Sequence, residues 1–241
     1  MATFVLVHGA WHDGGGWKET ARHLEAKGHR SFAPTMAGHG KGVNKRVNHA
    51  ECTKSIVDAM VSQGIMDAIL VGHSFGGTVI PKVVEAIPER IRRMVFVNGF
   101  VLADGHSLLD EVPPATAGVF EELAKHSPDG AVMIPFPVWR ETFMNDADLE
   151  TTKRAYAELS PSPSQPWKDK IDMKKFYALT TPRSYINCTE DIALPPGEWG
   201  WHPRMSGRLG LYRLVQMPGS HEVMYTNPAG LAEKLVEAGR D

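Results

Sequence analysis

A serine placed between glycines at the end of an apolar run constrains this chain more than any other feature. Ala68 to Val71 reads as a buried strand, and Gly72-His73-Ser74-Phe75-Gly76 follows it directly. The pattern G-x-S-x-G puts a serine hydroxyl on a sharp strand-to-helix turn, where close packing leaves no room for side chains at the flanking positions. Thr78 to Ala86 then has apolar residues at helical spacing. The stretch therefore predicts a strand, a tight turn that exposes Ser74, and a helix.

Short apolar runs alternate with helical stretches on both sides of this turn. The expected strands are Thr3 to Val7, Arg30 to Pro34, the run ending at Val71, Met94 to Val97, Arg183 to Cys188 and Leu211 to Met217. Expected helices follow Trp17, Asn48 and Thr78, and a last one runs from Pro228 to Ala238. Near-continuous apolar strands separated by helices are typical of parallel sheets covered on both faces. The predicted fold class is α/β, with a mostly parallel central sheet.

The composition changes between residues 103 and 181, where prolines interrupt short helical pieces. We expect one catalytic domain from residues 1–102 and 182–241, with 103–181 inserted as a helical cap. Aromatic side chains of this insertion are candidates for lining a pocket or for its own core: Phe120, Phe136, Trp139, Phe143, Tyr156, Trp167, Phe176 and Tyr177.

Charge and cysteine content exclude several function classes. The 241 residues include 26 basic and 28 acidic ones, and the basic residues are scattered, which argues against nucleic acid or an anionic membrane as partner. Cys52 and Cys188 form neither a disulfide framework nor a metal-binding spacing, so a reducing, cytoplasmic setting is expected. No apolar run approaches the length of a membrane span. A small neutral or weakly charged molecule is the expected partner, and no feature predicts an oligomeric state.

A serine hydroxyl becomes a good nucleophile only when a base takes its proton, so the turn at Ser74 predicts a histidine with an acid behind it. His221 fits the base, because it follows a strand, lies in a Gly/Ser loop and precedes the last helix. Asp191 fits the acid, in the loop after the preceding strand. Glu190 and Asp104 remain alternatives for the acid.

Acyl transfer also needs hydrogen-bond donors aimed at the developing oxyanion. The backbone N–H of Phe75 follows the nucleophile and supplies one donor. Ala10, in the loop after the first strand, can present the second, because Gly9 lets the backbone approach.

The glycines of the same loop have another possible interpretation, a dinucleotide-binding fingerprint. Gly14 to Gly16 follow a strand and open a helix, but Glu19 stands where the last glycine belongs and the next strand lacks the ribose-binding acid. His8 and His12 come without an H-E-x-x-H or cysteine cluster. We therefore expect neither a cofactor nor a metal.

Taken together, these motifs resemble those of the small α/β-hydrolase superfamily, in the branch of plant methylesterases, plant hydroxynitrile lyases and small bacterial carboxylesterases. The matching stretches are His8-Gly9-Ala10-Trp11, Gly72 to Gly76, Tyr185 to Asp191 and Gly219-Ser220-His221. The resemblance implies an α/β-hydrolase fold. By position it makes Ser74 the nucleophile, His221 the general base and Asp191 the acid. It places the oxyanion hole at the amides of Ala10 and Phe75.

Two departures from the family pattern bear on the reaction. The lyases have a threonine after the first-loop histidine and a lysine after the catalytic histidine, whereas this chain has Gly9 and Glu222. Loss of that positive charge favours ester hydrolysis over cyanohydrin cleavage. Bacterial members hydrolyse pyrethroid esters and benzimidazole carbamates such as carbendazim. The resemblance therefore implies a serine esterase acting on a small carboxylic or carbamic ester. The alternatives are a hydroxynitrile lyase on the same triad and a slow-turnover ligand-binding receptor.

Overall fold

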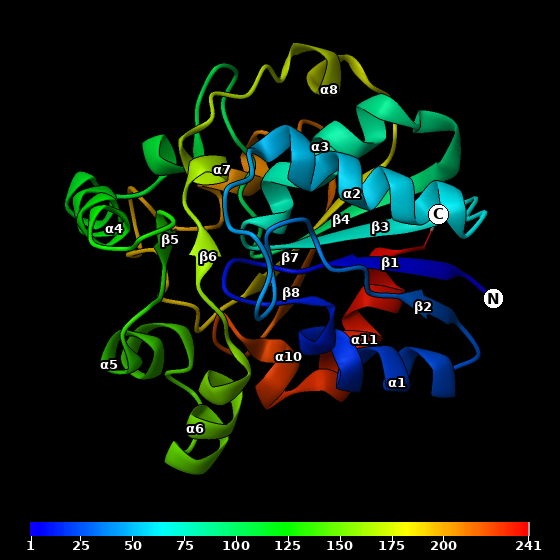
Figure 1. The fold of residues 1–241 in the computed structure, drawn as a ribbon. Coiled ribbons are helices and arrows are strands. Elements are labelled where there is room, and N and C mark those ends of the chain that lie inside the picture. The colour runs from blue at the N-terminus through cyan, green and yellow to red at the C-terminus, as the bar shows by residue number, and fades with distance from the viewer. Residues whose placement is uncertain (241) are drawn as a thin grey trace.

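A computed structural model describes residues 1–240 and places a six-stranded sheet at the centre of the molecule (Figure 1). Its strands are β1 (Thr3–Val7), β2 (Arg30–Phe32), β3 (Ala68–His73), β4 (Ile91–Val97), β7 (Arg183–Cys188) and β8 (Arg213–Met217). They lie in the order β2-β1-β3-β4-β7-β8, and every neighbouring pair is parallel. The predicted α/β class with a parallel sheet is confirmed.

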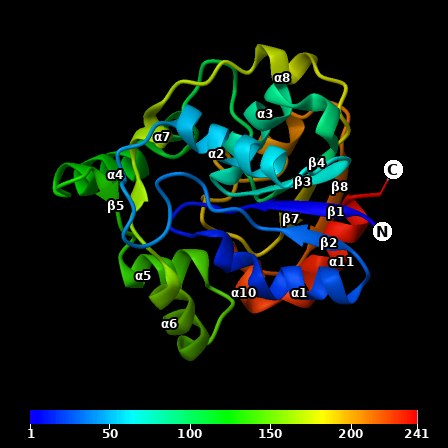
Figure 2. The ribbon, with the colours of Figure 1, turned by 45° about the vertical axis from the view of Figure 1, so that its right-hand side comes forward.

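Helices cover both faces of the sheet, as Figures 1 and 2 show. One face carries α2 (His49–Ser62) and α3 (Gly76–Ala86), and the other carries α1 (Lys18–Ala26), α10 (Val223–Thr226) and α11 (Pro228–Ala238). Successive residues of a strand point to opposite faces, so Val5 packs in one core while Phe4 and Leu6 pack in the other. Burial on both faces explains why these strands are continuous apolar runs.

Asn48 caps the helix before the serine turn, as predicted, and α2 begins at His49. The Asn48 side chain accepts from the Glu51 backbone N–H at 2.9 Å, and the Glu51 carboxylate accepts from the Asn48 N–H at 2.8 Å. This reciprocal capping satisfies two N–H groups that have no partner inside the helix.

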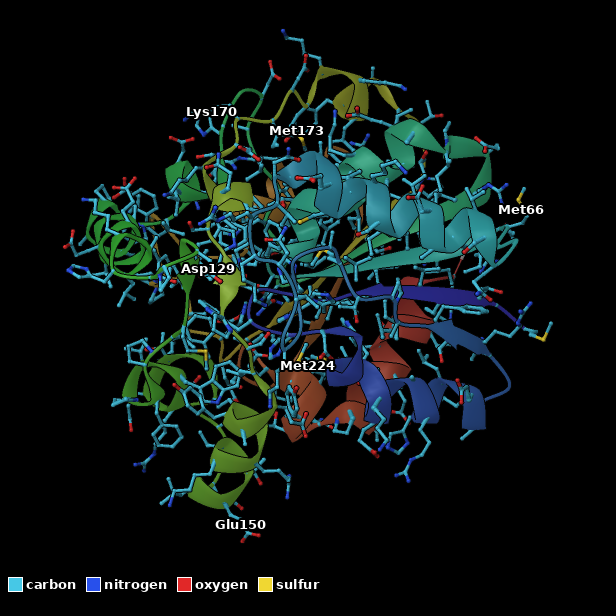
Figure 3. All side chains as sticks on the ribbon, viewed as in Figure 1. Met66, Asp129, Glu150, Lys170, Met173 and Met224 are labelled. Atoms are coloured by element: carbon cyan, nitrogen blue, oxygen red, sulfur yellow. The ribbon has the colours of Figure 1, made fainter. Side chains whose placement is uncertain are left out.

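The segment between β4 and β7 forms short elements, most of which lie on the side of the sheet where the strands end (Figure 1). They are α4 (Pro114–Lys125), β5 (Ala131–Val132), α5 (Phe136–Val138), α6 (Leu149–Glu158), β6 (Ser162–Pro163), α7 (Gln165–Lys168) and α8 (Lys174–Ala178), with a 3₁₀ turn at Leu108–Glu111 and a π-helical turn at Trp139–Phe143. We call residues 103–181 the cap. Figure 3 labels Glu150, Asp129 and Lys170 along its length.

The parts of the cap differ in what they cover. Strands β5 and β6 pair antiparallel and form a small second sheet, which the sequence did not predict because each strand has only 2 residues. The last helix, α8, packs against α3 rather than over the strand ends. In the described residues, no helix combines the length and apolar character needed to cross a bilayer. Cys52 and Cys188 are both buried and unpaired.

Candidate active site

Ser74 lies on the turn between β3 and α3 with a φ of +50°, the left-handed region that only few non-glycine residues adopt. The turn is tight on both sides. A Cβ on Gly72 would lie 2.7 Å from the Gly76 carbonyl oxygen, and one on Gly76 would lie 2.7 Å from the carbonyl oxygens of Val7 and His8. Both positions therefore require glycine, which is the physical reason for the G-x-S-x-G pattern.

The loop after β8 brings His221 to a carboxylate. Its Nδ1 donates to Oδ2 of Asp191 at 2.6 Å, and both side chains are almost completely buried. Asp191 is itself held in place: it accepts from the Asn98 side chain, and its Oδ1 accepts from the Ala193 backbone N–H at 2.8 Å. With Nδ1 protonated, Nε2 of His221 is left with a lone pair, as a general base requires.

The two other candidates for the acid lie elsewhere. Glu190 is exposed next to Asp191. Asp104 is also exposed, and it accepts from the Met173 backbone N–H at 2.9 Å within the cap. Of the three candidates, Asp191 is the one bonded to His221.

Burial by itself would lower the pKa of His221, but the charge of Asp191 and its hydrogen bond outweigh this effect. The net pKa lies above the usual value for histidine. The carboxylate thus favours the imidazolium form, which must appear when the base takes a proton.

The loop after β1 approaches the serine turn closely. A Cβ on Gly9 would lie 2.9 Å from Nδ1 of His73 and 3.0 Å from Cβ of Ser74, so this backbone has no space for the threonine of the lyases. Ala10 and Phe75 both line the same cavity as Ser74 and His221. The structure therefore brings together all five residues that the sequence singled out.

Trp11, the next residue of this loop, has a φ of +64° and is fastened to the cap. Its Nε1 donates to the Val132 carbonyl at 2.9 Å, and its own carbonyl accepts from the Ser160 N–H at 2.9 Å. These contacts hold the loop that carries Ala10.

Three buried histidines lie in the loop after β1 and at the end of β3, next to Ser74. His8, His12 and His73 are each at most 4% exposed. Burial is the main reason that the pKa falls to about 4 for His8, to about 3 for His12 and well below the usual value for His73. These three imidazoles are therefore neutral at pH 7.

One set of residues in the described part of the chain could surround a metal ion. Ligand atoms of His73, His221 and Glu222 lie within 4.8 Å of one another, and all three residues are buried. Each already makes hydrogen bonds: His73 with the His221 carbonyl at 3.0 Å, His221 with Asp191, and Glu222 with His12 at 2.8 Å. The arrangement is that of a hydrogen-bonded cluster rather than of free ligands.

The cavity above Ser74 measures about 330 Å³ and is almost entirely apolar. Apart from Ser74 and His221 it is lined by Ala10, Trp11, Phe75, Phe100, Leu108, Val112, Thr116, Val119, Phe120, Val138, Thr142, Phe143, Trp167, Ile192, Ala193, Leu194, Pro195 and Trp201. Within residues 1–240, no Lys, Arg, Asp or Glu side chain lines it. Of the eight aromatic candidates in the cap, Phe120, Phe143 and Trp167 line the cavity, and the other five pack elsewhere.

Glu222 occupies the position after His221 at which the lyases have a lysine. Its side chain turns away from the cavity and bonds to Nε2 of His12. This position therefore places neither a positive nor a negative charge in the cavity.

Sequence reasoning missed two further residues of the site. Asn98 directly follows β4 and holds Asp191; a polar residue at the end of a buried strand was the available signal. Trp201 stacks on the His221 ring with centroids 5.1 Å apart and planes 18° apart. It lies in an irregular loop, and no local pattern marks it.

Comparison with known proteins identifies the family of this chain. Residues 4–234 match the alpha/beta hydrolase family. The carbendazim hydrolyzing esterase of Nocardioides sp. (strain SG-4G) is 29% identical over 99% of this chain and 100% of its own length. Salicylic acid-binding protein 2 of Nicotiana tabacum is 26% identical over 97% of this chain and 95% of its own.

A solved structure of an extracellular alpha/beta-hydrolase from a Paenibacillus species is 42% identical and superposes with a TM-score of 0.97 over 100% of both chains. That protein is described as sharing structural and functional homology with the tobacco protein. Given this agreement of sequence, fold and family match, the chain belongs to the alpha/beta hydrolase family.

Proposed function

We propose that the protein is a serine carboxylesterase-type hydrolase that cleaves a small neutral carboxylic or carbamic ester through an acyl-enzyme. The observation that carries this proposal is the buried Asp191–His221 pair at a cavity that also contains Ser74 on its strained turn. Named esterases and methylesterases among the relatives support ester hydrolysis.

In the first half of the reaction, Ser74 Oγ attacks the ester carbonyl carbon while Nε2 of His221 takes the serine proton. The carbonyl oxygen becomes an oxyanion, to which the N–H groups of Ala10 and Phe75 donate. His221 then gives its proton to the leaving alcohol as the bond to the acyl carbon breaks.

In the second half, His221 removes a proton from a water molecule, and the resulting hydroxide attacks the acyl-serine. The second tetrahedral intermediate collapses, the acid is released, and His221 returns the proton to Ser74 Oγ. Asp191 holds the imidazole in the required tautomer throughout and stabilises its protonated form.

The cavity supports a neutral and largely apolar substrate. It has no charged lining residue, so burying an ionic group there would cost several kcal/mol without compensation. Its volume of about 330 Å³ suits a small ester. The same absence of a cation disfavours a hydroxynitrile lyase, because departing cyanide would have no positive partner.

Labelling with a fluorophosphonate tests the assignment of the nucleophile. We expect the wild type to react once per chain at Ser74 and the folded Ser74→Ala variant not to react. Label retained by that variant, or none on folded wild type, would overturn the proposal.

A panel of aliphatic esters, aryl esters and carbamates then defines the substrate. Turnover of a cyanohydrin in place of esters would indicate the lyase, and tight binding with almost no turnover would indicate a receptor.

A further inference from the structure

A buried hydrogen bond joins the two loops that carry reacting groups. His12 lies on the loop of Ala10, and Glu222 directly follows His221. Nε2 of His12 and Oε2 of Glu222 are 2.8 Å apart, and the two side chains are 4% and 2% exposed. Neither residue lines the cavity, so neither is in a place to touch the substrate.

We propose that His12 and Glu222 form a neutral bridge that shares one proton and positions the oxyanion-hole loop against His221. The carboxylic acid of Glu222 donates its O–H to Nε2 of His12, and the ring proton of His12 resides on Nδ1. This inference rests on the proposed esterase function and adds two positioning residues to it.

The surroundings of the pair disfavour an ion pair. The titratable side chains facing it are His8, His73, His221, Asp191 and Tyr225. Burial lowers the pKa of His12 to about 3, and repulsion from His8 and His221 adds to this. Burial raises the pKa of Glu222 to about 8, opposed by His221 and assisted by the negative charge of Asp191. At pH 7 both groups are therefore mainly uncharged.

Two further hydrogen bonds fix the backbone around His221, and neither has its partner in the loop of Ala10. The His221 carbonyl accepts from Nε2 of His73 at 3.0 Å, and the Glu222 N–H donates to the Phe143 carbonyl at 3.2 Å. The His12–Glu222 bond joins this backbone directly to the oxyanion-hole loop, and the packing of Phe143 on Trp11 adds an apolar contact to the same loop. Loss of the bond lets the two loops move relative to each other, and a misplacement of about 1 Å can cost roughly a hundredfold in rate.

Neutrality of Glu222 also matters for the base. An ionised Glu222 would add a second negative neighbour to His221 and raise its pKa further. Ionisation would also remove the O–H that donates to His12. Because the pKa of Glu222 lies near 8, the neutral bridge is present below that pH and is lost as the pH rises through it.

Two replacements of Glu222 separate these effects. Glu222→Leu removes the bridge at similar volume, whereas Glu222→Gln keeps an N–H donor to His12 but cannot ionise. With p-nitrophenyl butyrate at pH 7, we expect Glu222→Leu to lose roughly thirtyfold to a hundredfold in kcat, with KM changed by less than about threefold. Glu222→Gln should restore kcat to within about threefold of the wild type.

The pH profile provides a readout that a merely structural role would not change. The wild-type kcat should fall as the pH rises through about 8, and this fall should be absent in Glu222→Gln. Glu233→Gln is the matched control, because Glu233 is 66% exposed and pairs with Lys27 on the surface. It should keep the wild-type profile.

Circular dichroism and thermal unfolding establish that each variant is folded. If Glu222→Leu does not fold, the comparison of Glu222→Gln with the wild type across about pH 8 decides. Wild-type kcat in folded Glu222→Leu, or the same alkaline fall in Glu222→Gln, would overturn the bridge. Absence of Ser74-dependent hydrolysis in the wild type would instead overturn the proposed function, and this inference with it.

Discussion

The floor and the roof of the cavity are built from different chemistry. The floor comes from loops at the strand ends: Ser74 and His221 line the cavity, and Asp191 holds His221 through a hydrogen bond of 2.6 Å. The roof comes from the cap and contributes apolar side chains such as Phe120 and Trp167. Under the proposed function, we expect the floor to determine which bond is broken and the roof to determine which ester enters. Changes to the floor should lower kcat for every ester, and changes to the roof should alter the preference among esters.

The largest effect is expected from Asp191→Asn. The amide keeps the shape of the carboxylate but neither stabilises the imidazolium nor fixes the correct tautomer, so kcat should fall by roughly 10⁴-fold. Steady-state hydrolysis of ethyl acetate and of phenyl acetate measures this fall in kcat. Glu190→Gln is the matched control, because that neighbour is exposed. A loss that differs strongly between the two esters would break the separation of floor and roof.

Gly9→Ala should have the next largest effect. The new Cβ would lie 2.9 Å from Nδ1 of His73 and 3.0 Å from Cβ of Ser74, and the loop of Ala10 must shift to make room. We expect kcat to fall by roughly a hundredfold, as for loss of an oxyanion donor. Gly118→Ala in the cap is the control, since its Cβ would meet nothing within 4 Å. Equal activity of the two variants would contradict the close approach at Gly9.

Stability below pH 6.5 should distinguish the buried His49 of α2 from an exposed histidine of the cap. Burial lowers the pKa of His49 from 6.5 to about 4, so the unfolded chain binds its proton at a higher pH than the folded chain does. The contribution of His49 to the free energy of unfolding is therefore fully present above pH 6.5 and is lost as the pH falls toward 4. Linkage makes the loss roughly 2 kcal/mol between about pH 7.5 and pH 5.

Urea unfolding at these two pH values measures that change. His49→Gln should reduce the pH dependence by about that amount, whereas His126→Gln, at an exposed cap position with its side chain 75% exposed, should leave it unchanged. An identical pH dependence in wild type and His49→Gln would show that this histidine is not buried in its neutral form.

The smallest effect is expected in the roof. Phe120 lines the cavity and packs on Trp167 with ring centroids 5.4 Å apart. Phe120→Ala should shift the ratio of kcat/KM for phenyl acetate to kcat/KM for ethyl acetate by about tenfold. The kcat for ethyl acetate should stay within about twofold of the wild type. Phe136→Ala, which removes a cap aromatic outside the cavity, should leave the ratio unchanged. A uniform fall in kcat in Phe120→Ala would argue against the division of roles.

The sheet and the ends of its helices were predictable because local chemistry determines them. Strand Arg183–Cys188 and helix Pro228–Ala238 lie where the apolar run and the first-turn proline placed them. The strand expected from Leu211 begins instead at Arg213, because Gly210 with a φ of +69° and the exposed Leu211 form the preceding turn.

The cap and the supporting contacts of the site were harder to predict. A two-residue strand such as β5 has no periodicity, and tertiary contacts alone define it. Order along the chain predicted Ser74 and His221 as partners but left Asp191, Glu190 and Asp104 as candidates for the acid. The bond from Asn98 to Asp191 joins residues far apart in sequence, and no local pattern encodes such a contact.

The hydrogen bonds of Trp11 limit how freely this enzyme could be rebuilt. Its indole donates to Val132 and its carbonyl accepts from Ser160, both in the cap, while the preceding residue is Ala10. A cap transplanted from a relative with another substrate would therefore have to supply an acceptor for the Trp11 indole N–H and a donor for the Trp11 carbonyl, as well as a new cavity lining. Because Trp11 ties the cap to the loop of Ala10, a change of cap would alter substrate preference and the support of the oxyanion-hole loop at the same time.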